Sequence, residues 1–213
     1  MADRLKLIYQ KLLAYYGAPD WWPARTPYEV MVGAVLTQNT AWSNVELAIR
    51  NFGDELSAQT VRDIEIEDLK QIIRPSGFYN QKAIYLKAVT DWYGGYDFDV
   101  SAVQSEPLPK LRTELLSTKG VGPETADSIL LYAFDFPVFV VDAYTVRLCG
   151  RYPLETGRGY EAVRSYFENN LERDRRLYNE FHALIVIHAK EHCRKKAICA
   201  GCPLTETCLK QGV

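Results

Sequence analysis

The sequence lacks any long apolar run. No segment reaches the ~18 consecutive apolar residues that a membrane-spanning helix requires. The first 17 residues carry charges too early and too often for a secretory signal peptide. These absences argue against a membrane protein with helical spans and predict a cytoplasmic one.

The sequence also lacks a strong excess of either charge. The formal net charge is -2 at pH 7, so the overall balance does not indicate a nucleic-acid partner. A DNA-binding protein with this composition must carry its positive charge in local patches. There is no internal repeat or low-complexity linker, and 213 residues can bury a substantial core unaided.

Cysteine is scarce, with five residues, but four of them fall within the last 21 positions. In a reducing cytoplasm such a group indicates metal or cofactor binding rather than disulfides. The spacing is C-x5-C-x2-C-x5-C, which suits a [4Fe–4S] cluster or a zinc ion. Zinc ribbons present two close cysteine pairs and this sequence has one, which favours the cluster. The predicted ligands are Cys193, Cys199, Cys202 and Cys208.

Strand signals are almost absent, because Val138–Val141 is the one strand-like run. We interpret it as a buried extended connector. Elsewhere apolar residues recur at steps of three and four, which predicts an orthogonal all-α fold. Besides an N-terminal helix ending at Gly17 and a helix that begins at Thr26-Pro27, the expected helices cover 42–52, 66–73, 79–93, 109–117, 124–134, 143–150, 159–170 and 174–191.

The run Leu115–Ala126 reads LLSTKGVGPETA and predicts a helix-hairpin-helix. One helix ends, a Gly-Val-Gly turn follows, and Pro123 opens the next helix. The second helix then presents unpaired N–H groups and its positive dipole end, which suit a phosphate. A plain helical turn is the alternative that Gly-x-Gly alone would favour. The predicted DNA contacts here are Lys119, Gly120, Val121 and Gly122.

Asp142 follows the apolar connector and precedes a helix, about 20 residues after the hairpin. An aspartate there is a good N-cap on structural grounds alone. The hairpin, this aspartate and the cysteine spacing together resemble the endonuclease III superfamily of DNA glycosylases, and the resemblance covers nearly the whole chain. It includes Leu36–Thr40 and Ser76–Lys82. The resemblance implies that Asp142 is the catalytic carboxylate.

The resemblance implies two helical domains, with DNA in the cleft between them and a C-terminal iron–sulfur loop. We expect a middle domain over 21–134, and a second domain formed by 1–20 together with 135–213. Relatives that also cut the DNA strand carry a lysine two residues after the second hairpin glycine, whereas this sequence has Glu124. A carboxylate cannot form a Schiff base. We therefore expect a monofunctional glycosylase.

The aromatic residues resemble the base pocket of endonuclease III-like 3-methyladenine glycosylases, which also depart from the lysine at the position of Glu124. Flat aromatic faces stack on bases, with an advantage for cationic alkylpurines. The alternative is an aromatic core layer. Some relatives carry a pocket lysine two residues after the position of His182, where this sequence has Leu184. The predicted pocket comprises Trp22, Pro23, Trp42 and Glu124.

Further DNA contacts follow from the same resemblance. Gln38 corresponds to the residue that fills the gap left by a flipped base, and Phe78 to a wedge in the base stack. Arg194, Lys195 and Lys196 give the cysteine loop local positive charge, and the segment from Val186 onward carries five basic and two acidic residues, a net +3. The expected partner is double-stranded DNA with a damaged base, bound by a monomer in a bacterial or archaeal nucleoid.

Two other functions fit the same residues. A uracil or thymine mismatch glycosylase would use the same carboxylate on another base. A non-catalytic DNA-binding protein would use only the hairpin and the basic loop.

Overall fold

The computed structural model describes residues 2–19 and 21–213, and only the backbone of residues 2 and 3. Within these residues all regular secondary structure is helical, as the sequence predicts. The chain forms two compact units. One contains the N-terminal segment through Pro23 together with Pro137–Val213, and the other contains Ala24–Phe136. None of the described helices is long and apolar enough to cross a membrane.

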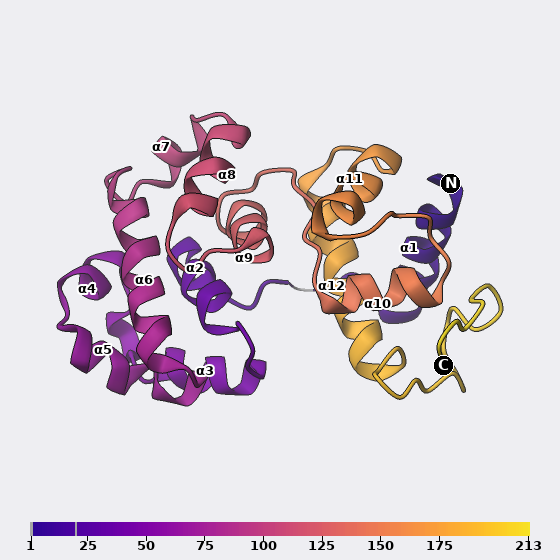
Figure 1. Cartoon of the computed structure of the whole chain (residues 1–213), viewed down its shortest axis with the longest axis horizontal. Coiled ribbons are helices and arrows are strands. Elements are labelled where there is room, and N and C mark those ends of the chain that lie inside the picture. The colour runs from indigo at the N-terminus through magenta and orange to yellow at the C-terminus, as the bar shows by residue number, and fades with distance from the viewer. Residues whose placement is uncertain (1, 20) are drawn as a thin grey trace. The chain divides into compact units, whose positions relative to one another are not determined.

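The first unit is organised around one long helix, α12 (Arg175–Glu191), against which α1 and α10 pack (Figure 1). Asp174 caps the start of α12, because its side chain accepts from the Leu177 amide. An aromatic cluster of Phe139, Phe167 and Phe181 fills the interior of this unit. The other helices are α1 (Ala2–Tyr16), α10 (Ala143–Arg151) and α11 (Tyr160–Asn170).

The second unit is organised around α2 (Pro27–Leu36), of which every residue after Pro27 is buried. Thr26 starts this helix, because its hydroxyl accepts from the Glu29 amide and Pro27 occupies the first turn. Helices α3, α6 and α9 and the π-helical turn η3 all pack against α2. The elements here are α3 (Trp42–Arg50), η1 (Gly53–Glu55), α4 (Ala58–Asp63), α5 (Ile66–Ile72), η2 (Arg74–Ser76), α6 (Tyr79–Gly94), α7 (Val100–Gln104), α8 (Leu108–Ser117), α9 (Pro123–Ser128) and η3 (Ile129–Ala133).

The long helices begin and end close to the positions expected from the sequence, and Gly17 follows α1 with φ +74°. Two short helices, α4 and α7, were not expected. Both begin at a side-chain cap, Ser57 for α4 and Asp99 for α7. The single helix expected over 124–134 is instead α9 followed by the π-helical η3.

The connector Val138–Val141 is extended and buried, as predicted, and it pairs with no strand in the part of the chain that the structure describes. It leads directly into α10, so it places Asp142 at the first turn of that helix.

Candidate functional site

Asp142 is the N-cap of α10. Its Oδ1 accepts hydrogen bonds from the Thr145 amide (2.7 Å) and the Thr145 hydroxyl (2.9 Å). The residue is 9% exposed. The carboxylate is therefore fixed by its own helix and is largely shielded from water.

His182, on α12, is the imidazole neighbour of this carboxylate. Its Nε2 lies 3.5 Å from Asp142 Oδ2. Burial raises the pKa of Asp142, but the contact with His182 and the hydrogen bonds from Thr145 outweigh it, so the pKa lies below its ordinary value of 3.8. Asp142 is consequently ionised at neutral pH. Sequence reasoning missed this partner, because the two residues are 40 positions apart.

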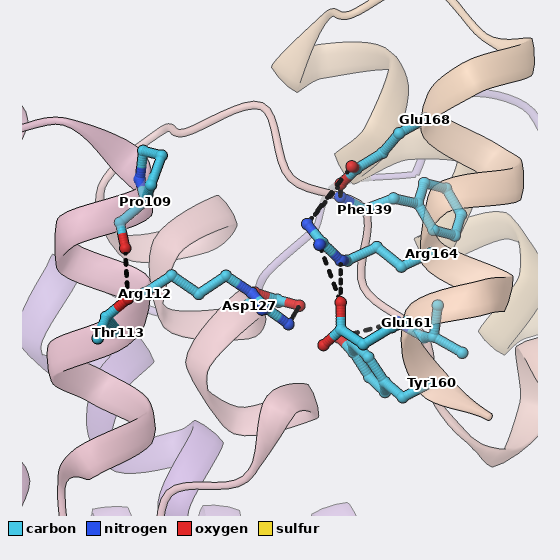
Figure 2. A network of polar contacts seen from close by, with 10 residues as sticks. Pro109, Arg112, Thr113, Asp127, Phe139, Tyr160, Glu161, Arg164 and Glu168 are labelled. Carbon is cyan, nitrogen blue, oxygen red and sulfur yellow. Dashed lines mark hydrogen bonds and ion pairs between the residues drawn. The ribbon is translucent and has the colours of Figure 1, made fainter.

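Side chains of α11 hold the connector that carries Asp142. Figure 2 shows the Glu168 carboxylate in contact with the Phe139 amide, which donates to it at 3.0 Å, and with the guanidinium of Arg164. The Val141 amide, one residue before Asp142, donates to the Tyr160 hydroxyl at 3.4 Å. These contacts replace the ladder that a strand would provide, so the connector keeps one conformation without a sheet.

The helix-hairpin-helix forms between α8 and α9, and its first glycine is tightly enclosed. Gly120 has φ +82°, and a Cβ added to it would lie 2.1 Å from the Tyr85 ring. Its carbonyl accepts from the Gln38 side chain at 3.0 Å, and the same Gln38 amide reaches the Thr125 hydroxyl at 3.0 Å. Gln38, expected in the DNA base stack, is thus bonded to the hairpin turn in this structure.

The rest of the hairpin turn faces outward. Gly122 is exposed, with nothing within 4 Å of an added Cβ, and Lys119 and Glu124 are exposed as well. Val121 differs: its side chain is buried and its amide donates to Thr118. Of the predicted contacts in the turn, Lys119 and Gly122 are accessible to a phosphate, and Val121 has neither its side chain nor its amide available.

A buried ion pair joins the two hairpin helices. The Arg112 guanidinium, on α8, donates to both carboxylate oxygens of Asp127, on α9, at 2.7 and 3.1 Å. Asp127 is fully buried, and Figure 2 shows the two side chains extended toward each other. This fork-to-fork geometry fixes the angle between α8 and α9.

Phe78 is a large apolar side chain that is 66% exposed. It stands in the left-handed region (φ +46°) directly after Gly77 (φ +64°), and it begins α6. An exposed aromatic ring on such a backbone is uncommon and fits a contact residue.

Lys82 is a buried lysine that links two of these loops. Its Nζ donates to the carbonyl of Leu36, at the end of α2, and to that of Ser76, at 2.9 and 2.6 Å. The first carbonyl lies two residues before Gln38 and the second two residues before Phe78. In the sequence Lys82 is only the last residue of the Ser76–Lys82 motif, and no local pattern predicts its contacts with the two carbonyls.

The predicted base-pocket residues belong to different units. Trp22 and Pro23 lie in the first unit, where the Trp22 ring packs edge-on against Trp21 with centroids 5.8 Å apart. Trp42 lies in the second unit, at the start of α3, and its indole N–H donates to Glu46. Both rings are half-buried and keep part of their surface accessible. Leu184, at the position of the pocket lysine of some relatives, is fully buried.

Two of the four C-terminal cysteines, Cys193 and Cys208, contact the buried Arg151. The Arg151 guanidinium donates to the Cys193 sulfur (3.3 Å) and to the Lys195 carbonyl (2.9 Å), and the Arg151 carbonyl accepts from Cys208 (3.4 Å). Burial raises the pKa of Cys202, and the charges of the other three thiols add to this. Among the described residues, no three His, Cys, Asp or Glu side chains lie close enough to hold one metal ion.

The basic residues of this loop are exposed. Lys195 and Lys196 face solvent, whereas Arg194 donates through Nε to the Lys190 carbonyl at 2.6 Å. The backbone carbonyls of Arg194 and Lys195 are both held by Arg151. The loop therefore presents positive charge on a fixed backbone, as phosphate binding requires.

Comparison with known proteins gives one consistent result. The family model of the HhH-GPD superfamily of base excision DNA repair proteins matches residues 32–173. A candidate DNA repair glycosylase of Methanocaldococcus jannaschii is 50% identical over 211 residues, covering 96% of this chain and 95% of that protein.

Solved structures have the same fold. A 3-methyladenine DNA glycosylase of H. pylori, bound to 1,N6-ethenoadenine, has a TM-score of 0.73 at 30% identity, covering 89% of this chain and 95% of that one. An endonuclease III solved in a non-covalent complex with DNA has a TM-score of 0.81 at 20% identity, covering 99% and 96%. The chain belongs to the HhH-GPD superfamily of base excision DNA repair proteins and has the endonuclease III-like fold of its helix-hairpin-helix glycosylases.

Proposed function

We propose that the protein is a monofunctional DNA glycosylase that removes alkylated purines, such as 3-methyladenine, from double-stranded DNA. The observation that carries the proposal is the environment of Asp142. This carboxylate is buried, ionised and fixed at the first turn of α10. A carboxylate of this kind suits a reaction that develops positive charge beside it.

Hydrolysis of an N-glycosidic bond is such a reaction. The bond between the base nitrogen and the sugar C1′ breaks, its electron pair leaves with the base, and positive charge develops on the sugar. Asp142 stabilises that charge and orients a water molecule, whose oxygen bonds to C1′ while the proton that it loses passes to the solvent. The product is an abasic site. Burial strengthens the electrostatic effect, because little water screens it.

The absence of strand cleavage rests on Glu124. It occupies the position, two residues after Gly122, where lyase relatives carry the attacking lysine, and it is exposed in the first turn of α9. A carboxylate cannot form the imine that β-elimination requires. Negative charge in the first turn instead stabilises the helix.

The choice of alkylated purines rests on the aromatic residues and on similarity. Trp22 and Trp42 keep accessible ring surface, and such faces bind cationic bases with an advantage over neutral ones. The 30% identity to a 3-methyladenine DNA glycosylase supports the same class. Gly122, Lys119 and the exposed Phe78 would contact the duplex around the lesion.

A [4Fe–4S] cluster would be held by the four C-terminal cysteines. The four thiols, which lie near enough for the other three to raise the pKa of Cys202, supply the donor set that such a cluster takes, and a cluster holds its thiolates farther apart than one ion does. When bound, it would cross-link the basic loop and would supply no chemistry to the hydrolysis. An absorbance band near 400 nm with about four irons per chain supports the cluster; one zinc per chain and no such band contradicts it.

The function is tested by measuring base release from four duplexes of one sequence. They contain 3-methyladenine, 1,N6-ethenoadenine, uracil, or thymine opposite guanine. Release of the two adenine adducts, with the pyrimidine duplexes intact, is the expected result. Release of uracil or thymine alone would replace the substrate class and leave the catalytic proposal standing. Binding to all four without release would indicate a non-catalytic DNA-binding protein.

Strand cleavage is tested by adding borohydride during the same reactions. A monofunctional enzyme leaves no covalent protein–DNA adduct, whereas an adduct would overturn the assignment of Glu124. Glu124→Lys is the matched variant, since it places the missing amine at that position.

A further inference from the structure

The two oxygens of the Asp142 carboxylate have different surroundings. Oδ1 accepts two hydrogen bonds from Thr145, which occupies the two lone pairs that a carboxylate oxygen offers. Oδ2 is the oxygen that remains for the reacting sugar or water. His182 lies beside it, with Nε2 at 3.5 Å.

Both members of this pair are shielded from water. Asp142 is 9% exposed and His182 is 5% exposed, and they stand on α10 and α12, which pack together. An ionised carboxylate in such a place is costly unless an opposite charge or hydrogen bonds compensate it.

Several charged groups of the surrounding elements contact partners other than Asp142. Glu168 on α11 accepts from Phe139 and Arg164, and Glu180 on α12 accepts from Tyr9. Arg147 on α10 donates to the Cys193 carbonyl. His182 is thus the group placed to compensate Oδ2. Arg151 on α10 contacts the cysteine loop, and His188 on α12 contacts Tyr16 and Cys202.

We propose that His182 is a positioning residue whose imidazolium orients Oδ2 of Asp142 and keeps this buried carboxylate ionised for bond cleavage. The inference rests on the proposed function, because it concerns the same carboxylate. Protonation of Oδ2 would give a neutral acid that cannot stabilise charge on the sugar.

The first test titrates Asp142 without any substrate. Carbon-13 NMR of aspartate carboxyls follows the titration, and the Asp142 signal is assigned by its absence in Asp142→Asn. In the wild type we expect it to stay ionised as far down in pH as the protein remains folded. His182→Gln keeps a donor but loses the charge, and His182→Leu loses both.

The expected pKa of Asp142 follows the order Leu variant, Gln variant, wild type, from highest to lowest, with a rise of about one unit or more for leucine. Tyr178→Phe is the matched control. Tyr178 lies one turn earlier on α12 and is fully buried, and its hydroxyl has no hydrogen-bond partner in the described part of the chain. An unchanged Asp142 pKa in folded His182→Gln and His182→Leu would overturn the inference.

The second test is the pH profile of single-turnover base release. In His182→Gln the acid limb of the profile should move to higher pH together with the Asp142 pKa, while the maximum rate at higher pH persists. At a pH below the Asp142 pKa of both proteins, each unit by which that pKa rises should make the variant about tenfold slower than the wild type. A lower plateau with an unmoved limb would mean that His182 only packs, and would contradict the proposal. If the wild type releases no base from any duplex, the proposed function fails, whereas the NMR titration still decides the role of His182.

Discussion

The hairpin and the Asp142 site build their functional groups in opposite ways. The hairpin exposes its backbone at Gly122. Contacts of Gly120, Gln38 and the Arg112–Asp127 pair hold the turn in place. The Asp142 site buries a side-chain charge and surrounds it with Thr145 and His182. A surface that contacts any phosphate needs only shape and a fixed backbone. A carboxylate that acts on one bond needs a fixed charge in a dry environment.

The comparison is sharpest within the hairpin, between its two glycines. Gly120→Ala should destabilise the protein by about 2–4 kcal/mol, because its Cβ would overlap the Tyr85 ring at a positive φ. Gly122→Ala should cost no more than about 1 kcal/mol, because its Cβ meets open space. Chemical denaturation measures both values.

DNA affinity should show the reverse dependence. The methyl group of Gly122→Ala would stand where a phosphate approaches the turn, so binding to an undamaged duplex should weaken while the fold persists. Equal destabilisation by the two substitutions would contradict the division of roles between the glycines.

Lys82 gives a pH-dependent test of the buried contacts that hold the loops before Gln38 and Phe78. Burial lowers its pKa from 10.5 to about 8. Between these values the unfolded chain binds more protons than the folded one, so the free energy of unfolding should gain from Lys82 as pH rises from about 8 to 10.5. Its two carbonyl acceptors favour the ammonium and limit the gain to on the order of 1–2 kcal/mol.

The measurement compares the wild type with Lys82→Met across this pH range by denaturation. The variant should be less stable throughout, because it leaves the Leu36 and Ser76 carbonyls without this donor. The stability difference should widen toward pH 10.5. A difference that narrows would show that the ammonium is favoured by the fold.

The smallest expected effect concerns the connector. Tyr160→Phe removes the acceptor of the Val141 amide, a long hydrogen bond at 3.4 Å, and should destabilise by about 0.5–1 kcal/mol. If the connector positions Asp142, base release should fall by a small factor at every pH, without a shift of the acid limb. A shifted limb would place Tyr160 in the electrostatics of the carboxylate instead.

The parts of the fold that depend on local signals were predictable from the sequence. Thr26-Pro27 starts α2 and Gly17 follows α1, because capping and turn chemistry act over a few residues. The short helices α4 and α7 were missed, since five or six residues show too little periodicity. The π-helical turn η3 follows from packing against α2, which no local pattern reports.

The site was predictable to the same extent. The motif predicts Asp142 as the catalytic carboxylate, which stays a prediction, and the observed N-cap geometry of Asp142 matches the local expectation. His182, Lys82 and Arg151 were missed as supporting residues, because each reaches its partner across the fold. Val121 was predicted to contact DNA, but its side chain is buried. The residue types in a turn do not tell which side chains point inward and which point outward.

The most direct test of the account is base release by Asp142→Asn from the duplex whose damaged base the wild type removes. Asparagine caps a helix as well as aspartate does, so the variant should fold with nearly unchanged stability and still bind DNA. The account predicts that single-turnover release falls by about 10²–10⁴-fold, because the charge that stabilises the sugar is gone. Release at the wild-type rate by a folded variant would contradict the assignment of Asp142 as the catalytic carboxylate.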